Sequence, residues 1–497
     1  MRGLEKLPEG AVVLKSAAVQ LVAFLMAVLP MTAGRDTAAS YADEDVGEPS
    51  WFRKDHGVVS DDYPLPAQFG SDARQRWRTP LPPGHSTPCV CGDFVFLTTY
   101  DAASRELAIV ALDRAVGTLK WKRVVPFEQL ESFHATSSPA SSTPACNGRQ
   151  VFAFFGSYGM ICCDLEGNLL WEKRMGPFQD EFGAASSPIL LGDRLILNED
   201  HDVDSFLMAM DQATGDIIWK TARTEATRSY STPVILETAD GPQIVVAGSL
   251  RLSGYDAASG RPMWWYSGLS RLVDSTPVIA NGLIHLATWT PGGDEGERIQ
   301  MEPYAEAVAS YDRNGDSGIS QEELPEGSEV NSRFFRIDLN QDKKLDQAEW
   351  ERHAQVFAQA RNVALAIRPG GTGELTGSSV LWTYQRGLPT VPSSIVYDGV
   401  FYMVRDTGIV TLLDAGTGEL LDQGRAAGRG NYYASLVAGD GKVYLASESG
   451  VMTILKAGRT FEIQSSHDFG ERIVATPVFS RGAMYLRTDA AVYSFTE

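Results

Sequence analysis

Two acidic segments in the second half of the chain contain residue types at a spacing suited to binding a divalent cation. Residues 312–323 read DRNGDSGISQEE, and residues 338–349 read DLNQDKKLDQAE. Oxygen-bearing side chains occupy positions 1, 3, 5 and 9 of each segment, and a Glu that can bind through both oxygens closes it. This pattern is typical of a calcium loop, in which position 7 supplies a backbone oxygen. The predicted ligands are Asp312, Asn314, Asp316, Gly318, Ser320 and Glu323 in the first segment, and Asp338, Asn340, Asp342, Lys344, Asp346 and Glu349 in the second.

Together the two segments predict a pair of EF-hand loops. Position 8 is Ile319 in the first loop and Leu345 in the second, and through these apolar residues paired loops contact each other. Position 6, normally Gly, is Ser317 in the first loop and Lys343 in the second, and a left-handed backbone costs such residues about 1 kcal/mol. We therefore expect modest calcium affinity. The alternative is an acidic, solvated helical hairpin that binds no metal.

Residues 199–204, which read EDHDVD, form a second group of potential ligands. They lie in a connection between two expected strands, of the same type as the connection that holds the calcium loops. Their carboxylates and imidazole could bind a second cation or a ligand, helped by two arginines in neighbouring connections. The candidate residues are Asp200, His201, Asp202, Asp204, Arg228 and Arg271. The alternative is a solvated loop whose Asp side chains cap its turns.

A repeated pattern predicts the elements that position these residues. A Ser/Thr-Pro step precedes a short apolar run at positions 88, 144, 188, 233, 277 and 477, with weaker copies at 395 and 436. Successive copies are separated by 56, 44, 45, 44, 118, 41 and 41 residues. A second pattern, an Asp followed by a Gly turn and then a Trp, recurs at Asp113, Asp164, Asp211 and Asp256, and without the Trp at Asp414. Apolar runs between tight Gly turns indicate strands, and a regular period indicates a repeat fold.

Eight such units predict an all-β, eight-bladed β-propeller with a small α-helical insertion, carrying the EF-hand pair, in the fifth blade. The strand around Trp77 lacks the earlier strands of a unit of its own, so we expect it to complete the final blade by pairing with residues 491–496. The expected segments are a signal peptide at 1–39, a linker at 40–50, the closing strand with blades one to four and the start of blade five at 51–301, the EF-hand insertion at 302–361, and the end of blade five with blades six to eight at 362–497.

The N-terminus has the features of a secretory signal peptide. Basic residues up to Lys15 precede an apolar run at 17–29, which is followed by small residues. This run is shorter than the roughly 20 residues that span a bilayer. We therefore expect an exported protein, periplasmic or extracellular, with no membrane span after cleavage. An uncleaved membrane anchor is the competing interpretation.

Composition excludes several classes of protein. The chain has 497 residues, of which 43% are hydrophobic and 21% are charged, which argues against wholesale disorder and against a polytopic membrane protein. The formal net charge of -20 argues against nucleic-acid binding, which depends on Lys and Arg. The 5 Cys lie close together in the chain, and an odd count leaves at least one thiol without a partner in the same chain. The simplest interpretation is that they are small buried residues on strands.

The repeat resembles that of quinoprotein-type propellers, whose signature is Ala-x-Asp-x-x-Thr-Gly-x-x-x-Trp. Residues 209–219, AMDQATGDIIW, match it at every defined position. The resemblance covers the chain from about residue 75 onward apart from the insertion, and it implies a fold rather than an activity. Members include pyrroloquinoline-quinone (PQQ) alcohol dehydrogenases and non-enzymatic propellers such as the BamB-like outer-membrane assembly factors.

PQQ alcohol dehydrogenases carry a vicinal disulfide near their cofactor, and Cys162 and Cys163 are adjacent in this chain. The pair nevertheless occupies an ordinary strand position before a repeat Asp, where neighbouring side chains point to opposite faces. We therefore expect calcium rather than PQQ as the bound group, and we assign no catalytic residue. The expected function is a non-catalytic binding or assembly scaffold, with a protein or polysaccharide partner at the propeller face. A PQQ-dependent oxidoreductase is the alternative.

Overall fold

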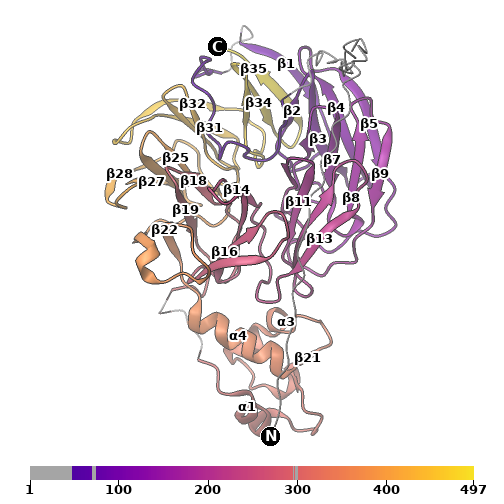
Figure 1. Cartoon of the computed structure of the whole chain (residues 1–497), viewed down its shortest axis with the longest axis vertical. Coiled ribbons are helices and arrows are strands. Elements are labelled where there is room, and N and C mark those ends of the chain that lie inside the picture. Colours follow the sequence, from indigo (N-terminus) through magenta and orange to yellow (C-terminus); the bar gives the residue numbers. More distant parts are fainter. Residues whose placement is uncertain (1–47, 70–73, 295, 297–299) are drawn as a thin grey trace, which may run out of the picture. The chain divides into compact units, whose positions relative to one another are not determined.

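The computed structural model describes residues 48–69, 74–294, 296 and 300–497, all within one compact unit. The expected signal peptide and most of the expected linker lie outside the described residues. Eight large sheets, seven of four strands and one of five, follow one another around a ring (Figure 1). The chain is therefore an eight-bladed β-propeller, which confirms the all-β prediction.

Each of the first seven blades begins with its inner strand and continues outward along the chain. Blade one contains β2 (Cys89–Cys91), β3 (Phe94–Asp101), β4 (Glu106–Asp113) and β5 (Leu119–Val125); blade two contains β6 (Ala145–Cys146), β7 (Gln150–Phe154), β8 (Met160–Asp164) and β9 (Leu169–Lys173); blade three contains β10 (Ile189–Leu191), β11 (Arg194–Glu199), β12 (Phe206–Asp211) and β13 (Ile217–Ala222); blade four contains β14 (Val234–Leu236), β15 (Gln243–Gly248), β16 (Arg251–Asp256) and β17 (Pro262–Ser267), with β23 (Gly373–Glu374) added in parallel.

The second half of the ring is built in the same way, except that blade eight takes its outer strand from the N-terminal region. Blade five contains β18 (Val278–Ala280), β19 (Leu283–Thr288), β22 (Val363–Ile367) and β24 (Val380–Tyr384); blade six contains β25 (Ile395–Tyr397), β26 (Val400–Val404), β27 (Ile409–Asp414) and β28 (Leu420–Arg425); blade seven contains β29 (Val437–Gly439), β30 (Lys442–Ala446), β31 (Val451–Lys456) and β32 (Ile463–Asp468); blade eight contains β33 (Val478–Ser480), β34 (Ala483–Arg487), β35 (Ala491–Phe495) and β1 (Gln75–Pro80).

A helical insertion separates β19 from β22 in blade five. It contains α1 (Tyr304–Tyr311), the 3-10 turn η3 (Gln321–Glu323), α2 (Glu329–Ser332), α3 (Phe334–Ile337) and α4 (Gln347–Gln359), with the two-residue strands β20 (Ile319–Ser320) and β21 (Lys344–Leu345) paired between them. Seven buried residues, from Ala307 to Trp350, give the insertion a small apolar core of its own. Within the described ranges, no helix is long and apolar enough to cross a membrane.

The N-terminal strand closes the ring. β1 pairs antiparallel with β35, so that Trp77 lies opposite Ser494 and blade eight is built from both ends of the described chain (Figure 1). Trp77 is buried, and its Nε1 donates to the backbone oxygen of Arg114 in blade one at 3.1 Å. The strands at the two ends of the chain are thereby paired rather than left as open sheet edges.

The Trp contact at this junction recurs between other blades. In each case the outer-strand Trp donates to the backbone oxygen of the residue that follows the repeat Asp of the next blade. The pairs are Trp77–Arg114, Trp121–Leu165, Trp171–Gln212, Trp219–Ala257 and Trp382–Ala415, at 2.6–3.2 Å. The turn Gly of the next blade lies directly against the ring, since a Cβ on Gly215 would be 2.6 Å from Trp171 Cε3. Gly is therefore required both for its positive φ of 74° and for the close approach of the indole.

The cysteines combine two arrangements. Cys91 and Cys146 form a disulfide that joins blades one and two, with their Cα atoms 6.3 Å apart. Cys89, Cys162 and Cys163 are free and buried. The interpretation of the cysteines as small buried residues therefore holds for three of the five, and the other two are covalently linked.

We expect Gly215→Ala to destabilise the protein more than the matched control Gly192→Ala. Both residues have positive φ, 74° and 58°, but a Cβ on Gly192 meets no atom within 4 Å, whereas one on Gly215 overlaps Trp171. Left-handed backbone alone costs about 1–2 kcal/mol, and overpacking adds about 1–3 kcal/mol. Thermal unfolding of both variants, followed by circular dichroism, measures the difference. Equal melting temperatures would show that the packing of Trp171 does not depend on this Gly.

Candidate functional site

A ring of hydroxyl groups surrounds the axis of the propeller. Each blade supplies one Ser or Thr two residues before its inner strand. These residues, here called the hydroxyl ring, are Thr87, Thr143, Ser187, Thr232, Thr276, Ser393, Ser435 and Thr476. At seven of the eight junctions, the backbone N–H of one member donates to the side-chain oxygen of the member in the next blade, at 2.9–3.3 Å. In blade one the ring member Thr87 is followed by Pro88, which marks the repeat position. In blade six the ring member is Ser393, so the repeat position is Ser394 and not residue 395 as the sequence predicted.

The eighth junction, between blades eight and one, is held by a buried guanidinium group. Arg487 is 1% exposed, and its Nη1 donates to Ser86 Oγ at 2.6 Å and to the Ser86 backbone oxygen at 3.2 Å. Its Nη2 donates to the backbone oxygen of Pro82 at 3.5 Å. Burial lowers the pKa of Arg487 to about 9, because the charged form loses its hydration. Backbone oxygens and one hydroxyl group thus hold the cation that closes the ring.

The hydroxyl ring encloses a cavity of about 560 Å³, lined further out by the connections between blades. Phe182, Tyr230 and Tyr433 contribute aromatic surface to its wall. Each ring hydroxyl except that of Thr87 accepts a backbone hydrogen bond, but none donates to a protein acceptor in the described part of the chain. Eight O–H groups are therefore left to interact with whatever occupies the cavity.

The N-terminal segment runs beside the inner strands, next to the hydroxyl ring. Ser50 exchanges two backbone hydrogen bonds of 2.8 Å with the inner strand of blade two, and Val58 bridges to that of blade seven. Between them, Arg53 donates to backbone oxygens just before the inner strands of blades six and seven, at 2.7 Å each. Burial lowers the pKa of Arg53 to about 9. The adjacent Phe52 lines the cavity, so this segment forms the floor.

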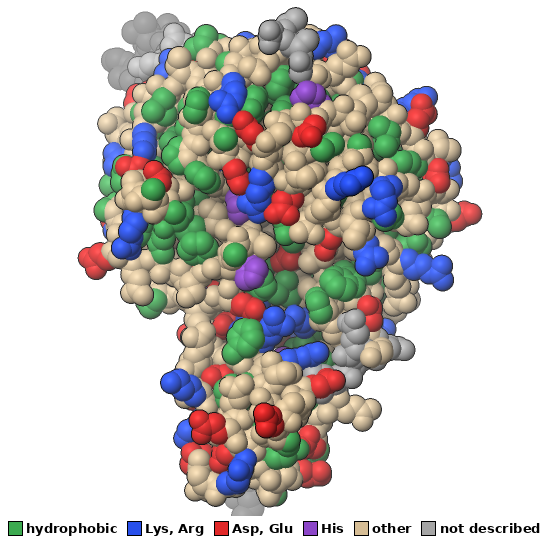
Figure 2. Space-filling view, turned by 180° about the vertical axis from the view of Figure 1, so that it is seen from behind, with side chains coloured by type: hydrophobic (Ala, Val, Ile, Leu, Met, Phe, Trp, Pro, Cys, Tyr) green, Lys and Arg blue, Asp and Glu red, His purple; other side chains and the backbone are tan. Residues whose placement is uncertain are grey.

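Charged side chains of both signs lie on the cavity wall. Arg271, from the connection between blades four and five, and Arg336 of α3 are both on it. Burial lowers the pKa of Arg271 to about 10, and the neighbouring Arg336 acts in the same direction. Asp274 and Asp406 also line the cavity, and burial raises the pKa of Asp274 to about 7, with a further contribution from Asp406. Figure 2 shows basic side chains gathered where the insertion meets the blades.

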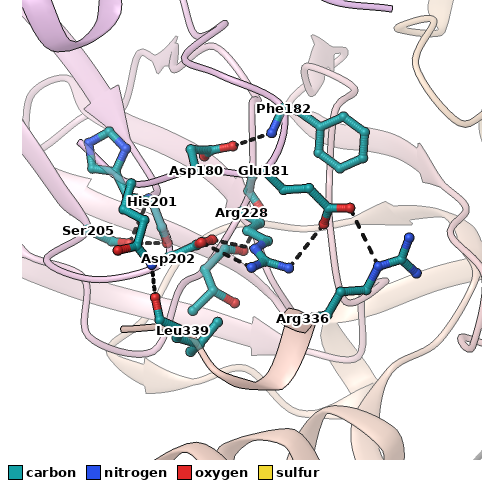
Figure 3. A network of polar contacts seen from close by, with 12 residues as sticks. Asp180, Glu181, Phe182, His201, Asp202, Ser205, Arg228, Arg336 and Leu339 are labelled. Atoms are coloured by element: carbon teal, nitrogen blue, oxygen red, sulfur yellow. Dashed lines mark hydrogen bonds and ion pairs between the residues drawn. The ribbon is translucent and has the colours of Figure 1, made fainter. Parts of the chain in front are cut away.

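An ion-pair network joins the insertion to blade three (Figure 3). Arg228 binds Asp202 through Nε and Nη2, and its Nη1 lies 3.1 Å from a carboxylate oxygen of Glu181. The other oxygen of Glu181 lies 3.5 Å from Arg336 Nε. One carboxylate thus lies between an arginine of the propeller and an arginine of the insertion.

Two further contacts hold the insertion against blade three and its connections. Gln179 Nε2 donates to the backbone oxygen of Leu339, the second residue of the second predicted calcium loop. Arg352 of α4 donates to the backbone oxygen of Thr224 at 2.5 Å. The second loop is therefore fixed directly to the face on which the cavity opens.

The candidate ligand residues at 199–204 are mostly buried, which corrects the alternative of a solvated loop. Asp200, His201 and Asp202 are each at most 2% exposed. Asp200 binds the guanidinium group of Arg223 through both oxygens, at 2.7 and 2.9 Å. Since Asp202 is bound by Arg228 in the same way, the carboxylates neutralise arginines rather than facing a ligand.

The remaining candidates are placed differently from one another. His201 stacks on Phe178 with ring centroids 4.0 Å apart, and burial lowers the pKa of His201 to about 3. Asp204 is exposed, with a φ of 61°. Of the six predicted residues, only Arg271 lines the cavity.

The first predicted calcium loop folds its carboxylates onto its own backbone. Asp312 accepts from the N–H of Gly315 at 2.7 Å and of Ser317 at 2.9 Å. The closing Glu323 accepts from the N–H of Arg313 at 3.0 Å and of Ser320 at 2.9 Å. Asn314 accepts from the N–H of Asp316, and Asp316 accepts from the N–H of Gly318.

The second loop repeats this arrangement. Asp338 accepts from the N–H of Lys343 at 2.9 Å, while its Oδ1 is buried without a hydrogen-bond partner. Burial raises the pKa of Asp338. Glu349 accepts from the N–H of Leu339 at 2.8 Å and of Asn340 at 3.1 Å. Asp342 accepts from the N–H of Lys344, and Asp346 caps α4 by accepting from the N–H of Glu349.

The two loops contact each other at two points. Ile319 lies opposite Leu345 in the β20–β21 pair, so the eighth positions meet. Lys344 Nζ lies 2.6 Å from Asp316 Oδ2, which places a cation of one loop on a predicted ligand of the other. In the described ranges, no three His, Cys, Asp or Glu side chains are gathered closely enough to hold a metal ion as they stand.

Cys162 and Cys163 lie away from the cavity. Cys163 packs in the apolar cluster between blades one and two, and Cys162 in the cluster between blades two and three. Burial raises the pKa of both thiols, that of Cys163 to about 11. The pair is placed as two core residues of a strand whose side chains alternate between faces.

Sequence reasoning missed the residues that shape the cavity. The hydroxyl ring was recognised only as a marker of the repeat, although a Ser or Thr stands at this position in every blade. The recurrence of a hydroxyl group could have indicated a hydrogen-bonding role, because a position that only shapes a turn would also accept other small residues. For Asp274, Asp406 and Arg336, the sequence offers no comparable pattern.

Comparison with known proteins supports the repeat architecture. The profile of the family described as "Outer membrane protein assembly factor BamB" matches residues 52–195, 137–288 and 203–496. Among curated proteins, no sequence matches the chain significantly.

Solved structures share the fold at low sequence identity. BamB from Moraxella catarrhalis is 12% identical with a TM-score of 0.52, and the match covers 85% of this chain and 99% of that one. The computationally designed Ika8 protein is 10% identical with a TM-score of 0.51, covering 85% and 100%. A europium-containing methanol dehydrogenase is 9% identical with a TM-score of 0.51, covering 91% and 99%. These likenesses show that the fold is shared over nearly the whole propeller. The profile matches together span residues 52–496, and on that basis the chain belongs to the family described as outer membrane protein assembly factor BamB.

Proposed function

We propose that the protein is an exported, calcium-binding propeller that acts as a non-catalytic binding or assembly scaffold. The family description names an assembly factor, which supports a scaffold role for this chain. The observation that carries the calcium part of the proposal is the pairing of the two twelve-residue loops through Ile319 and Leu345. Loops paired in this way position two sets of oxygen ligands side by side.

The donor set of the loops fits calcium. The hard carboxylate, amide and carbonyl oxygens of both loops are the ligands that this cation prefers. Asp338 Oδ1 is a buried acceptor without a partner, which a cation in the second loop would satisfy. Ser317 and Lys343 adopt the positive φ of position 6, at 65° and 71°, so the expected strain is present and weak binding follows.

Charge in the insertion also favours cation binding. Residues 302–358 contain 13 Asp or Glu and 6 Lys or Arg, a net formal charge of -7 within one small element. Calcium would replace repulsion between loop carboxylates by coordination. Since the second loop is bound to blade three through Leu339 and precedes α4, its occupancy would stiffen the insertion on the propeller face.

Glu323→Gln and Glu349→Gln should each remove one bound calcium ion, because an amide cannot bind with two anionic oxygens. Isothermal titration calorimetry of the unsubstituted protein should show two ions with dissociation constants of about 10⁻⁴ to 10⁻³ M. Glu351→Gln, on the exposed side of α4, is the matched control and should bind both ions. Absence of calcium uptake at millimolar concentration, or unchanged uptake in the double variant, would refute the calcium part of the proposal.

Reconstitution with PQQ and calcium should yield no tightly bound quinone and no dye reduction with alcohols or sugars. The reason is that the adjacent cysteines, which would support a quinone site by the family resemblance, are packed between blades rather than at the cavity. Absorbance of the protein after gel filtration and a dye-coupled assay provide the two measurements. Stoichiometric PQQ binding with substrate-dependent dye reduction would replace the scaffold proposal with the oxidoreductase alternative.

A further inference from the structure

We infer that the axial cavity binds a hydroxylated carboxylic acid of the uronic-sugar type, with its carboxylate on Arg271 and Arg336 and its hydroxyl groups on the other polar residues of the cavity wall. The inference deepens the binding role proposed above by naming a ligand class. Its test requires no calcium, so failure of calcium binding and failure of ligand binding can be told apart.

The two guanidinium groups have free donors at the cavity. Arg271 donates from Nε to the backbone oxygen of Pro291 at 3.0 Å, and Arg336 contacts Glu181 through Nε at 3.5 Å. Their terminal nitrogens form no hydrogen bond or ion pair in the described part of the chain. Terminal guanidinium nitrogens in this state are suited to a carboxylate, which they bind with paired, charge-assisted hydrogen bonds.

The neighbouring carboxylates do not neutralise this group. Glu181 lies between Arg336 and Arg228, and Arg228 already binds Asp202. Two arginines therefore share these two carboxylates, and Arg271 adds a third cation. Because Arg271 and Arg336 keep terminal nitrogens free, this part of the cavity is suited to one anionic group.

The acidic residues of the cavity wall favour hydroxyl groups rather than more negative charge. Asp406 accepts from Thr390 Oγ1 at 2.6 Å through one oxygen, and its Oδ1 is buried without a partner. Asp274 lies on the same cavity and forms no hydrogen bond in the described structure. These acceptors would repel a phosphate or a polyanion, but they can accept hydrogen bonds from sugar hydroxyl groups. The free O–H groups of the hydroxyl ring supply complementary donors.

Size and surface agree with a short acidic sugar. The volume of about 560 Å³ lies within the usual range for small-ligand sites. Phe182, Tyr230 and Tyr433 provide aromatic surface against which the less polar face of a sugar ring can pack. Donors, acceptors and aromatic rings thus surround one space, which a purely apolar or purely anionic ligand would not match.

The test uses galacturonic acid and, as a matched neutral probe, galactose, titrated by calorimetry into the whole protein in EDTA. The acidic sugar should bind more tightly than the neutral one by about tenfold or more, since loss of a charge-assisted contact is worth at least that factor. Arg271→Gln and Arg336→Gln should each weaken binding of the acidic sugar about tenfold or more, and Arg336→Lys should retain part of it. Arg459→Gln, at an exposed ion pair with Asp414, is the control and should leave binding unchanged.

Three results would overturn the inference. They are equal affinity for the acidic and neutral probes, no uptake of the acidic probe at about 10 mM, a concentration well above that at which small-ligand sites fill, or binding that is unaffected in the Arg271→Gln, Arg336→Gln double variant. Melting curves of every variant establish that each is folded, so that loss of binding reports on the cavity. Fluorescence of the aromatic wall on titration, compared with that of the double variant, gives a second readout.

Discussion

Hydrogen bonds around the axis determine where each blade lies. The inner strands meet at the centre, where their first backbone N–H groups have no partner within their own sheet. A hydroxyl group from the next blade accepts each bond, and Arg487 binds across the eighth junction. Each hydrogen bond contributes only about 1 kcal/mol to stability. A buried N–H without a partner would cost more, so breaking one junction of the ring is unfavourable. At five junctions a Trp contact lies at the outer edge as well, so those junctions are held both near the axis and near the rim, which fixes the angle between the two blades.

A framework constrained in this way leaves its connections free to differ. The connections within and between blades carry the insertion, the arginine network and the walls of the cavity, while the strands beneath them repeat. This division is common in folds whose binding residues lie on loops held by a rigid scaffold. It also explains why a shared fold with a methanol dehydrogenase carries no information on activity, since chemistry depends on residues that the repeat does not specify.

The sequence predicted the fold because the repeat period, the turn Gly and the outer Trp are local features. The number of blades and the pairing of β1 with β35 followed from counting the repeats. The repeat position in blade six was misplaced by one residue because Ser394 stands there instead of the Pro that marks most of the other repeats. The site was less accessible, because its contacts join residues that are remote in sequence. Asp200 was predicted as a possible contact for a cation or a ligand, since nothing near it in the chain reveals that Arg223 neutralises it in the interior. The loops at 312–323 and 338–349 were predicted as ligand sets from spacing alone, and their use of calcium stays a prediction.

The floor of the cavity has a consequence for the order of events during synthesis. Arg53 binds a backbone oxygen 383 residues further along the chain, and Arg487 binds Ser86 across 401 residues. Blades one to four can pair locally as they emerge, but the Arg53 contact cannot form until residue 436, just before blade seven, is made, and the Arg487 contact cannot form until the last blade is made. Contacts of such long range slow folding because a large loop must close before they contribute. The final closure is therefore a late step of folding, and until then the first inner strands lack the contacts that cover their edges.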